Sequence, residues 1–169
     1  MSRRSASLAL AILFTAAVQA ADWPQWRGPN RDGVWNESGI LETFPTNGLK
    51  VEWRTPVGYG FSSPIVAQGR VYVTDSLLKS PYIEARVRCF DEKNGAPLWA
   101  FSQNQPFPDW AFVRGQEAAP NGTPVLRDGR IFAPGPNNHS MFCLDARTGK
   151  LLWQRDLATD FHIEATAAL

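Results

Sequence analysis

The side chains best suited to contact a ligand gather in one segment, residues 103–120. It carries Asp109, Trp110 and Arg114. An indole stacks on a sugar or an aromatic ligand, and a guanidinium binds an anion through several hydrogen bonds. Asp109 and Glu117 are also two carboxylates, but acid–base catalysis needs positioned groups, and a shared segment does not supply that geometry. The alternative is that this segment folds back over its own sheet, with its aromatic side chains packed inward.

The histidines and cysteines do not indicate a metal site or a disulfide. His139 and His162 are the only histidines in the sequence, and their spacing matches no metal site. We expect His139 to lie in a solvated hairpin, and we keep it as a candidate contact. Cys89 and Cys143 occupy equivalent positions of a repeat, where their α-carbons would lie farther apart than the roughly 7 Å that a disulfide bridges. We therefore predict two small buried thiols.

The charge balance excludes one class of partner. The chain has 17 Lys and Arg against 16 Asp and Glu, a net charge of +1. Binding along a phosphate backbone needs a basic stripe, which this composition does not offer. We therefore predict no nucleic-acid partner.

Two stretches of the chain repeat one another. Residues 89–99 match residues 143–153, with an aspartate, a glycine and a tryptophan at identical offsets. Upstream of each, residues 63–73 match residues 123–133. The period of about fifty residues is typical of propellers and solenoids. The repeat is therefore the main evidence for the architecture.

Each repeat predicts four antiparallel strands. In the first repeat, residues 64–67 and 71–74 are short β-branched runs around a glycine turn. Residues 86–90 and 97–101 surround a second turn, which begins with an aspartate and ends with a glycine. The aspartate accepts hydrogen bonds from turn amides, and the glycine adopts the left-handed conformation that closes the turn. The second repeat has the same pattern.

The predicted fold class is all-β: a partial β-propeller of four-stranded antiparallel blades at residues 61–102 and 121–157, within a repeat region that spans 50–169. Residues 50–56, which include Trp53, are predicted to form a closing strand, and residues 21–49 an extended segment. Two blades cannot close a ring, so we expect a fragment of a longer propeller. The alternative is a complete small protein whose ring is assembled from several chains. We favour it less, because the exposed strand edges of a single secreted chain would be prone to aggregation.

The turns resemble a known family. The pattern Asp-x-x-Thr-Gly-x-x-x-Trp is similar to the tryptophan-docking motif of quinoprotein alcohol dehydrogenases and of the wider pyrroloquinoline-quinone-binding-like β-propeller repeat proteins. The second repeat matches it fully, and the first has Asn94 in place of threonine. The matching residues are Asp91, Gly95, Trp99, Asp145, Thr148, Gly149 and Trp153. Residues 22–33 also resemble the start of secreted members. The resemblance implies that these motif residues hold blades together rather than contact a cofactor.

The N-terminus indicates export. Arg3 and Arg4 precede an apolar run at residues 8–18, which is too short to span a bilayer, and a small-residue cleavage pattern ends at Ala20. We therefore predict a signal peptide at residues 1–20, a periplasmic or extracellular mature chain, and no membrane span.

Loop lengths predict where a partner binds. Tight turns are expected at one end of the blades, and long connections at the other, namely residues 75–82, 103–120 and 134–140. Function concentrates on loops that a rigid scaffold holds. The candidate partner contacts are Asp109, Trp110, Arg114 and His139.

Two function classes follow. The favoured one is an exported, non-catalytic binding or scaffold module for a protein, glycan or envelope partner, because no residue set resembles an active site. The alternative, which the family resemblance implies, is a fragment of an alcohol or sugar dehydrogenase that depends on pyrroloquinoline quinone and calcium. No residue in the chain can be assigned as its base or its ligands, so any such cofactor would need the full-length protein.

Overall fold

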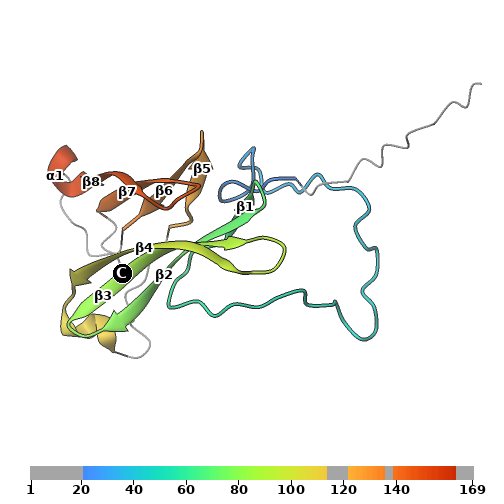
Figure 1. The fold of residues 1–169 in the computed structure, drawn as a ribbon, viewed down its shortest axis with the longest axis horizontal. Helices are drawn as coiled ribbons and strands as arrows, with labels where there is room; N and C mark the ends of the chain where they lie inside the picture. The colour runs from blue at the N-terminus through green and yellow to red at the C-terminus, as the bar shows by residue number, and fades with distance from the viewer. Residues whose placement is uncertain (1–20, 114–121, 136–138, 163–169) are drawn as a thin grey trace, which may run out of the picture.

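The computed structural model describes residues 21–113, 122–135 and 139–162. They form two four-stranded antiparallel sheets in which the strand order follows the chain (Figure 1). The first sheet contains β1 (Ile65–Ala67), β2 (Arg70–Lys79), β3 (Tyr82–Asp91) and β4 (Pro97–Pro106). The second contains β5 (Val125–Arg127), β6 (Arg130–Pro134), β7 (Ser140–Asp145) and β8 (Leu151–Asp156). The predicted all-β class, with two four-stranded blades of a partial propeller, is confirmed.

The first turn of each blade has the backbone that a two-residue hairpin needs. Gln68 and Gly69 have φ values of 55° and 72°, and Asp128 and Gly129 have values of 49° and 70°. Two consecutive positive φ angles are the mark of the type I′ turn, whose twist matches that of the flanking strands. These turns therefore set the register of β1 on β2 and of β5 on β6.

The second turn of each blade is held by its aspartate. Asp91 Oδ1 accepts hydrogen bonds from two turn amides at 3.0 and 3.1 Å. Asp145 Oδ1 does the same at 3.1 and 2.8 Å, and it also accepts the hydroxyl of Thr148 at 2.7 Å. Gly95 and Gly149 each donate a backbone N–H to the carbonyl of that aspartate, at 2.9 and 2.8 Å. The turns thus form as the sequence pattern predicts.

The core lies between the two sheets. Alternate residues of β3 point toward the second blade, and the facing side of β6 and β7 is apolar. The buried cluster joins both blades, and Trp99 and Phe101 of β4 pack against it. Its larger members are Ile65, Tyr72, Val87, Leu126, Ile131, Phe142 and Leu144. Burial of this shared face is what fixes one blade against the other.

The connection between β2 and β3 differs from the prediction. Residues 75–82 are not a long loop, because β2 continues to Lys79 and β3 starts at Tyr82. The reason is an ion pair across the ladder, where Asp75 stands opposite Arg86 and bonds to it. A polar residue that looks like part of a loop is therefore a buried strand residue. β4 likewise runs on to Pro106, so the crossover to the second blade starts later than predicted.

The N-terminal segment joins the sheets without adding a strand to them. Residues 21–49 contain no helix or strand beyond a single bridge, in which Trp23 pairs with Val66 on the free edge of β1. The carbonyl of Pro24 then accepts the N–H of Leu126 in β5 at 2.8 Å. This segment therefore ties the inner edges of both blades together.

Residues 50–56, predicted to be a closing strand, pair with no strand among the described residues. The blade that such a strand would complete is neither of the two sheets, so the closing strand stays a prediction. Trp53 nevertheless lies against the turn of the first blade. Its indole N–H donates to the carbonyl of Glu92 at 2.8 Å.

Candidate partner-binding site

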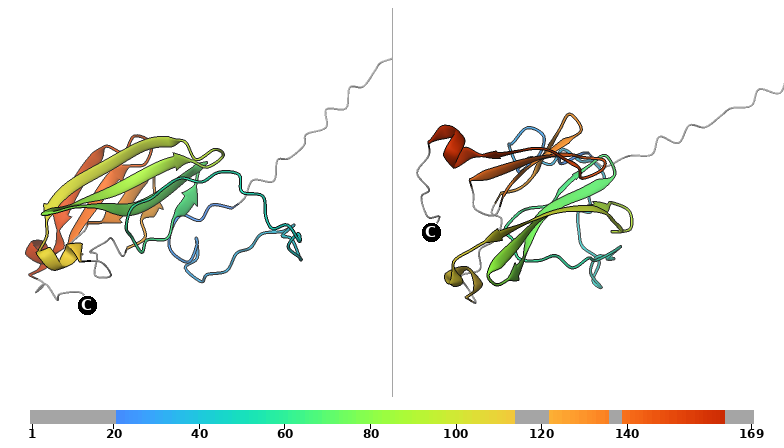
Figure 2. Two further views of the ribbon diagram at one scale, coloured as in Figure 1. Left: turned by 90° about the horizontal axis from the view of Figure 1, so that it is seen from below. Right: turned by 60° about the vertical axis from the view of Figure 1, so that its left-hand side comes forward.

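The short helices that follow β4 and β8 lie at the same end of the two sheets. β2, β4, β6 and β8 all run toward this end, where η1 (Asp109–Phe112) and α1 (Leu157–Phe161) follow β4 and β8 (Figure 2). The other end carries the four tight turns. We call the first of these the loop end.

The segment that contains η1 is hydrogen-bonded to the first blade and carries an exposed tryptophan. Phe107 donates its N–H to the carbonyl of Pro81 in the β2–β3 turn at 3.0 Å, and Ala111 is fully buried. Ala111 N–H donates to Pro108 at 3.0 Å and thereby closes the short helix. Trp110, by contrast, is 51% exposed, and Asp109 is exposed beside it. The indole of Trp110 is therefore not packed inward, although the buried Ala111 and the half-buried Phe107 and Phe112 agree with the alternative of a segment folded over its own sheet; residues 114–120 lie outside the described residues.

Of the other two predicted partner contacts, His139 lies within the described residues and Arg114 does not. His139 lies directly before β7 of the second blade, at the same end as η1, and is half-buried. Its carbonyl accepts the N–H of Leu157 at 2.6 Å, which connects it to α1. Arg114 and Glu117 lie outside the described residues, as does the signal peptide predicted at 1–20. The structure thus brings Asp109, Trp110 and His139 to one end of the scaffold.

A buried carboxylate that sequence reasoning missed lies in the first blade. Asp75 is 1% exposed and accepts hydrogen bonds from Arg86 Nε at 2.7 Å and Arg86 Nη2 at 2.5 Å. The N–H of Gly58 donates to it at 2.7 Å, and Arg88 lies 3.4 Å away. Burial acts to raise the pKa of the Asp75 carboxyl, but these donors outweigh it, and the net pKa lies below the usual value. The pair holds residues 56–59 on the sheet.

The buried thiol and phenol are also structural. Cys89 and Cys143 are both buried and free, as predicted. Burial raises the pKa of the Cys89 thiol to about 11 and that of the Tyr72 phenol to about 12. Tyr72 donates its hydroxyl to the carbonyl of Ala146 in the neighbouring blade at 3.3 Å. A neutral thiol and phenol at neutral pH serve packing and bonding between the blades rather than nucleophilic chemistry.

The interface between the blades centres on Trp99. Its indole lies over Gly149, close enough that a β-carbon on this glycine would sit 2.5 Å from Trp99 Cε3. Its N–H donates to the carbonyl of Ala146 at 3.1 Å. Trp53 repeats this arrangement over Gly95, with the same 2.5 Å approach. Of the motif residues, Trp99 and Gly149 therefore lie in the contact between the two blades, and Gly95 lies in the contact with Trp53.

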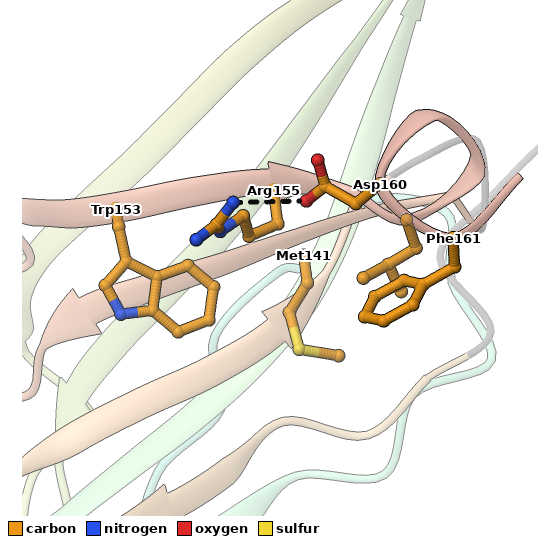
Figure 3. A pocket seen from close by; sticks show the side chains of 6 residues that line it. Met141, Trp153, Arg155, Asp160 and Phe161 are labelled. Carbon is orange, nitrogen blue, oxygen red and sulfur yellow. Dashed lines mark hydrogen bonds and ion pairs between the residues drawn. The ribbon is translucent and has the colours of Figure 1, made fainter.

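The outer face of the second blade contains a hollow of about 420 Å³. Figure 3 shows Trp153, Arg155 and Met141 on one side of it and Asp160 and Phe161 of α1 on the other. Arg155 and Asp160 form an ion pair at 3.4 Å. The hollow thus combines an apolar floor with one paired cation.

Two other features are absent from the described residues. No group of three or more His, Cys, Asp or Glu side chains among them is arranged to hold a metal ion. Within the same residues, no helix has the length and apolar character that a bilayer crossing requires.

The comparisons with known proteins agree with this geometry. A family model described as outer membrane protein assembly factor BamB matches residues 45–165. Over 164 residues the chain is 26% identical to 1-butanol dehydrogenase (cytochrome c) of Thauera butanivorans. This alignment covers 92% of this chain and 22% of the relative. Over 78 residues the chain is 33% identical to quinohemoprotein alcohol dehydrogenase ADH-IIG of Pseudomonas putida. This alignment covers 44% of this chain and 11% of the relative.

A solved structure has a similar fold. The quinohemoprotein alcohol dehydrogenase from Comamonas testosteroni superimposes with a TM-score of 0.53 at 21% identity, over 82% of this chain and 20% of that one. The chain therefore spans only about a fifth of the length of the relative and the structure that cover most of it. With the family model matching most of its length, the chain belongs to the β-propeller repeat family described as outer membrane protein assembly factor BamB, and quinoprotein alcohol dehydrogenases are among its relatives.

Proposed function

We propose that this chain contributes two blades to an exported, non-catalytic β-propeller that binds a protein partner in the cell envelope. The family it belongs to takes its description from an outer membrane assembly factor, and the N-terminal pattern predicts a cleaved export signal. The binding site in this proposal is the loop end.

The observation that carries the proposal is the exposed indole on a fixed support. Trp110 is half exposed, although Ala111 beside it is buried and η1 is bonded to the β2–β3 turn through Phe107. Tryptophan is enriched among the residues that dominate protein interfaces, because it buries a large area at a small cost in side-chain entropy. Asp109 beside it supplies a charge at the edge of the same surface.

The chemically capable side chains in the sheets support a non-catalytic role. The Asp75 carboxylate accepts hydrogen bonds from Arg86 and Gly58, and the Asp145 carboxylate accepts one from the Thr148 hydroxyl of its own turn. Tyr72 bonds to the next blade, and Cys89 is a buried thiol of raised pKa. Each of these groups is therefore engaged in a structural hydrogen bond or in core packing, which a catalytic role would have to break.

The test is a binding experiment with a matched tryptophan control. The polypeptide translated from the complete reading frame is immobilised and exposed to detergent-solubilised envelope proteins of its source, as wild type, Trp110→Ala and Trp35→Ala. Trp35 is 58% exposed and lies in the N-terminal segment, away from the loop end. We expect one protein that wild type and Trp35→Ala retain and Trp110→Ala loses. Equal retention by all three would contradict the proposal, and loss after enzymatic deglycosylation would indicate a glycan ligand instead.

The second candidate is part of a dehydrogenase that depends on pyrroloquinoline quinone and calcium. The names of the relatives favour it, since the relative that aligns over 92% of this chain is an alcohol dehydrogenase. Calcium takes six to eight oxygen ligands. The described residues contain no suitable acidic cluster, and the buried Asp75 is already bonded by Arg86, so these residues do not by themselves fit that ion.

This candidate is tested by activity. Dye-linked oxidation of 1-butanol by the complete polypeptide, dependent on both added quinone and added calcium, would establish the enzyme and overturn the binding proposal. An inert complete protein that still retains a partner through Trp110 would support the scaffold.

A further inference from the structure

The first residues after the predicted signal peptide are bound to the first blade one after another. Asp22 Oδ1 accepts the N–H of Gln68 in the β1–β2 turn at 3.0 Å. Trp23 exchanges two backbone hydrogen bonds with Val66 of β1, at 2.6 and 3.1 Å. The Trp23 indole also lies over Gly28, where an added β-carbon would sit 2.7 Å from Trp23 Cζ3. The chain is therefore fixed on the blade from Asp22 onward.

Ala21 is bonded to a carboxylate from farther along the N-terminal segment. Its backbone N–H donates to Glu37 Oε1 at 2.5 Å, across a separation of 16 residues. Ala21 is exposed, and Glu37 is partly buried. No Lys, Arg or His among the described residues forms an ion pair with Glu37. In the uncleaved chain, the Glu37 carboxylate thus has a neutral amide donor and no cation from these residues.

Cleavage after Ala20 would change the charge of that donor. A signal peptidase adds one water molecule across the peptide bond between Ala20 and Ala21. The Ala20 carbonyl carbon takes the oxygen and ends as a carboxylate, and the Ala21 nitrogen takes both protons and ends as an ammonium. An ammonium has three N–H donors and a positive charge, so it attracts the Glu37 carboxylate by its charge as well as by a hydrogen bond.

The new chain end would lie beside the connection between the two blades. Trp23 bridges to β1, and the carbonyl of Pro24 accepts the N–H of Leu126 in β5 at 2.8 Å. The end of a chain frays unless it is tied down. Cleavage creates such an end two residues before the Trp23 bridge, and Glu37 is the group that can tie it down.

We propose that removal of the signal peptide strengthens the attachment of the N-terminal segment: the new α-ammonium of Ala21 pairs with the Glu37 carboxylate and holds the connection between β1 and β5 in place. The precursor, whose Ala21 nitrogen is an amide, holds this connection less firmly. Because the signal peptide is removed during export, the ion pair forms only in the exported protein. It requires the export signal of the proposed function but not the loop end, so either can fail without the other.

The first test identifies the chain end in the exported protein. The protein is purified from its source cells, and mass spectrometry of its N-terminal peptide defines the first residue. We expect this residue to be Ala21 with a free amine. A mature chain that starts at another residue, or that keeps residues 1–20, would overturn the proposal.

The second test measures the ion pair by titration of the amine. The polypeptide translated from the complete reading frame is produced with Ala21 first and labelled with ¹³C-alanine, and the Ala21 methyl signal is followed by NMR against pH. Glu42→Gln is the matched control for Glu37→Gln, because Glu42 is an exposed carboxylate of the same segment. The Asp22 carboxylate is present in every variant, so its effect on the amine cancels in the comparison.

We expect the amine to titrate about 0.2–0.7 pH units higher in wild type and Glu42→Gln than in Glu37→Gln, the shift that corresponds to measured exposed ion pairs. The same titration midpoint in wild type and Glu37→Gln would refute the ion pair.

The third test asks whether the ion pair holds the segment in place. A version with one glycine and one serine added before Ala21 keeps the Ala21 N–H and moves the ammonium away from Glu37. Trypsin cleavage after the exposed Arg27 and Arg31 then reports how often the segment opens. We expect the extended protein to be cleaved about 1.4- to 5-fold faster than the protein that starts at Ala21, and this ratio to fall to one in a Glu37→Gln background. Equal rates in the wild-type background, or the same ratio in both backgrounds, would contradict the proposal.

Discussion

A β-carbon at Gly149 tests the contact on which the two blades depend. Gly149 has φ of 72°, and an added methyl would meet Trp99 Cε3 at 2.5 Å, well inside van der Waals contact. Gly129 is the matched control, because its φ is 70° and an added methyl would meet nothing within 4 Å. The two substitutions to alanine share the backbone cost and differ in the clash.

The expected magnitudes follow from this difference. A left-handed conformation costs a residue with a β-carbon about 1–2 kcal/mol, so Gly129→Ala should lower the free energy of unfolding by that amount. Gly149→Ala carries the same cost and must also displace a packed indole, and overpacking of this kind costs about 1–3 kcal/mol more. Trp99 is held by Tyr72 and by its bond to Ala146, which restricts its escape.

The assay is urea denaturation of the 169-residue protein followed by circular dichroism, with each variant compared by its midpoint and slope. We also make Gly149→Ala in a Trp99→Ala background. There the extra cost should vanish, leaving a loss similar to that of Gly129→Ala. Equal costs for Gly149→Ala and Gly129→Ala in the wild-type background would refute the reasoning, since the indole would then not lie on the glycine.

Three further predictions concern titratable groups. Asp75→Asn should lower the free energy of unfolding at pH 7 by about 3–5 kcal/mol, because it leaves a buried guanidinium without its partner charge. Because the folded-state pKa of Asp75 is depressed, the difference from wild type in urea denaturation should shrink as the pH falls below about 4. A difference that stays constant from pH 7 to pH 2 would contradict this. The Thr148 hydroxyl is the main cause that lowers the pKa of Asp145, so Thr148→Ala should raise it in an NMR titration, and an unchanged titration would count against that bond. The Cys89 thiol, whose pKa burial raises to about 11, and the buried Cys143 should react with a thiol reagent at pH 7.5 only after denaturation, and rapid labelling of the native protein would show that the inter-blade core opens.

The parts of the fold that were predictable are those set by short-range chemistry. An aspartate, a glycine and a tryptophan at repeated offsets specify a turn and a strand, and the turns at Asp91 and Asp145 form with the expected bonds. The free state of Cys89 and Cys143 followed from their equivalent places in neighbouring blades.

What the sequence could not provide depends on pairing across the ladder. Asp75 looked like the start of a loop, because its partner Arg86 is eleven residues away and only the register of β2 on β3 brings them together. The closing strand at residues 50–56 stays a prediction, since Trp53 contacts a turn of the first blade while its segment has no neighbouring strand among the described residues.

At the candidate site, sequence reasoning identified the loop end but not its internal support. The exposure of Trp110 results from the burial of Ala111 and the bond of Phe107 to the β2–β3 turn, neither of which has a sequence signature.

Site-specific photocrosslinking in the source cells tests whether the loop end binds a protein. A photoreactive phenylalanine analogue replaces Trp110 at the loop end or Trp35 in the N-terminal segment, and adducts are identified by mass spectrometry. We expect one envelope protein to be crosslinked from position 110 and not from position 35. No adduct from position 110, or the same adducts from both positions, would contradict a protein-binding surface at the loop end.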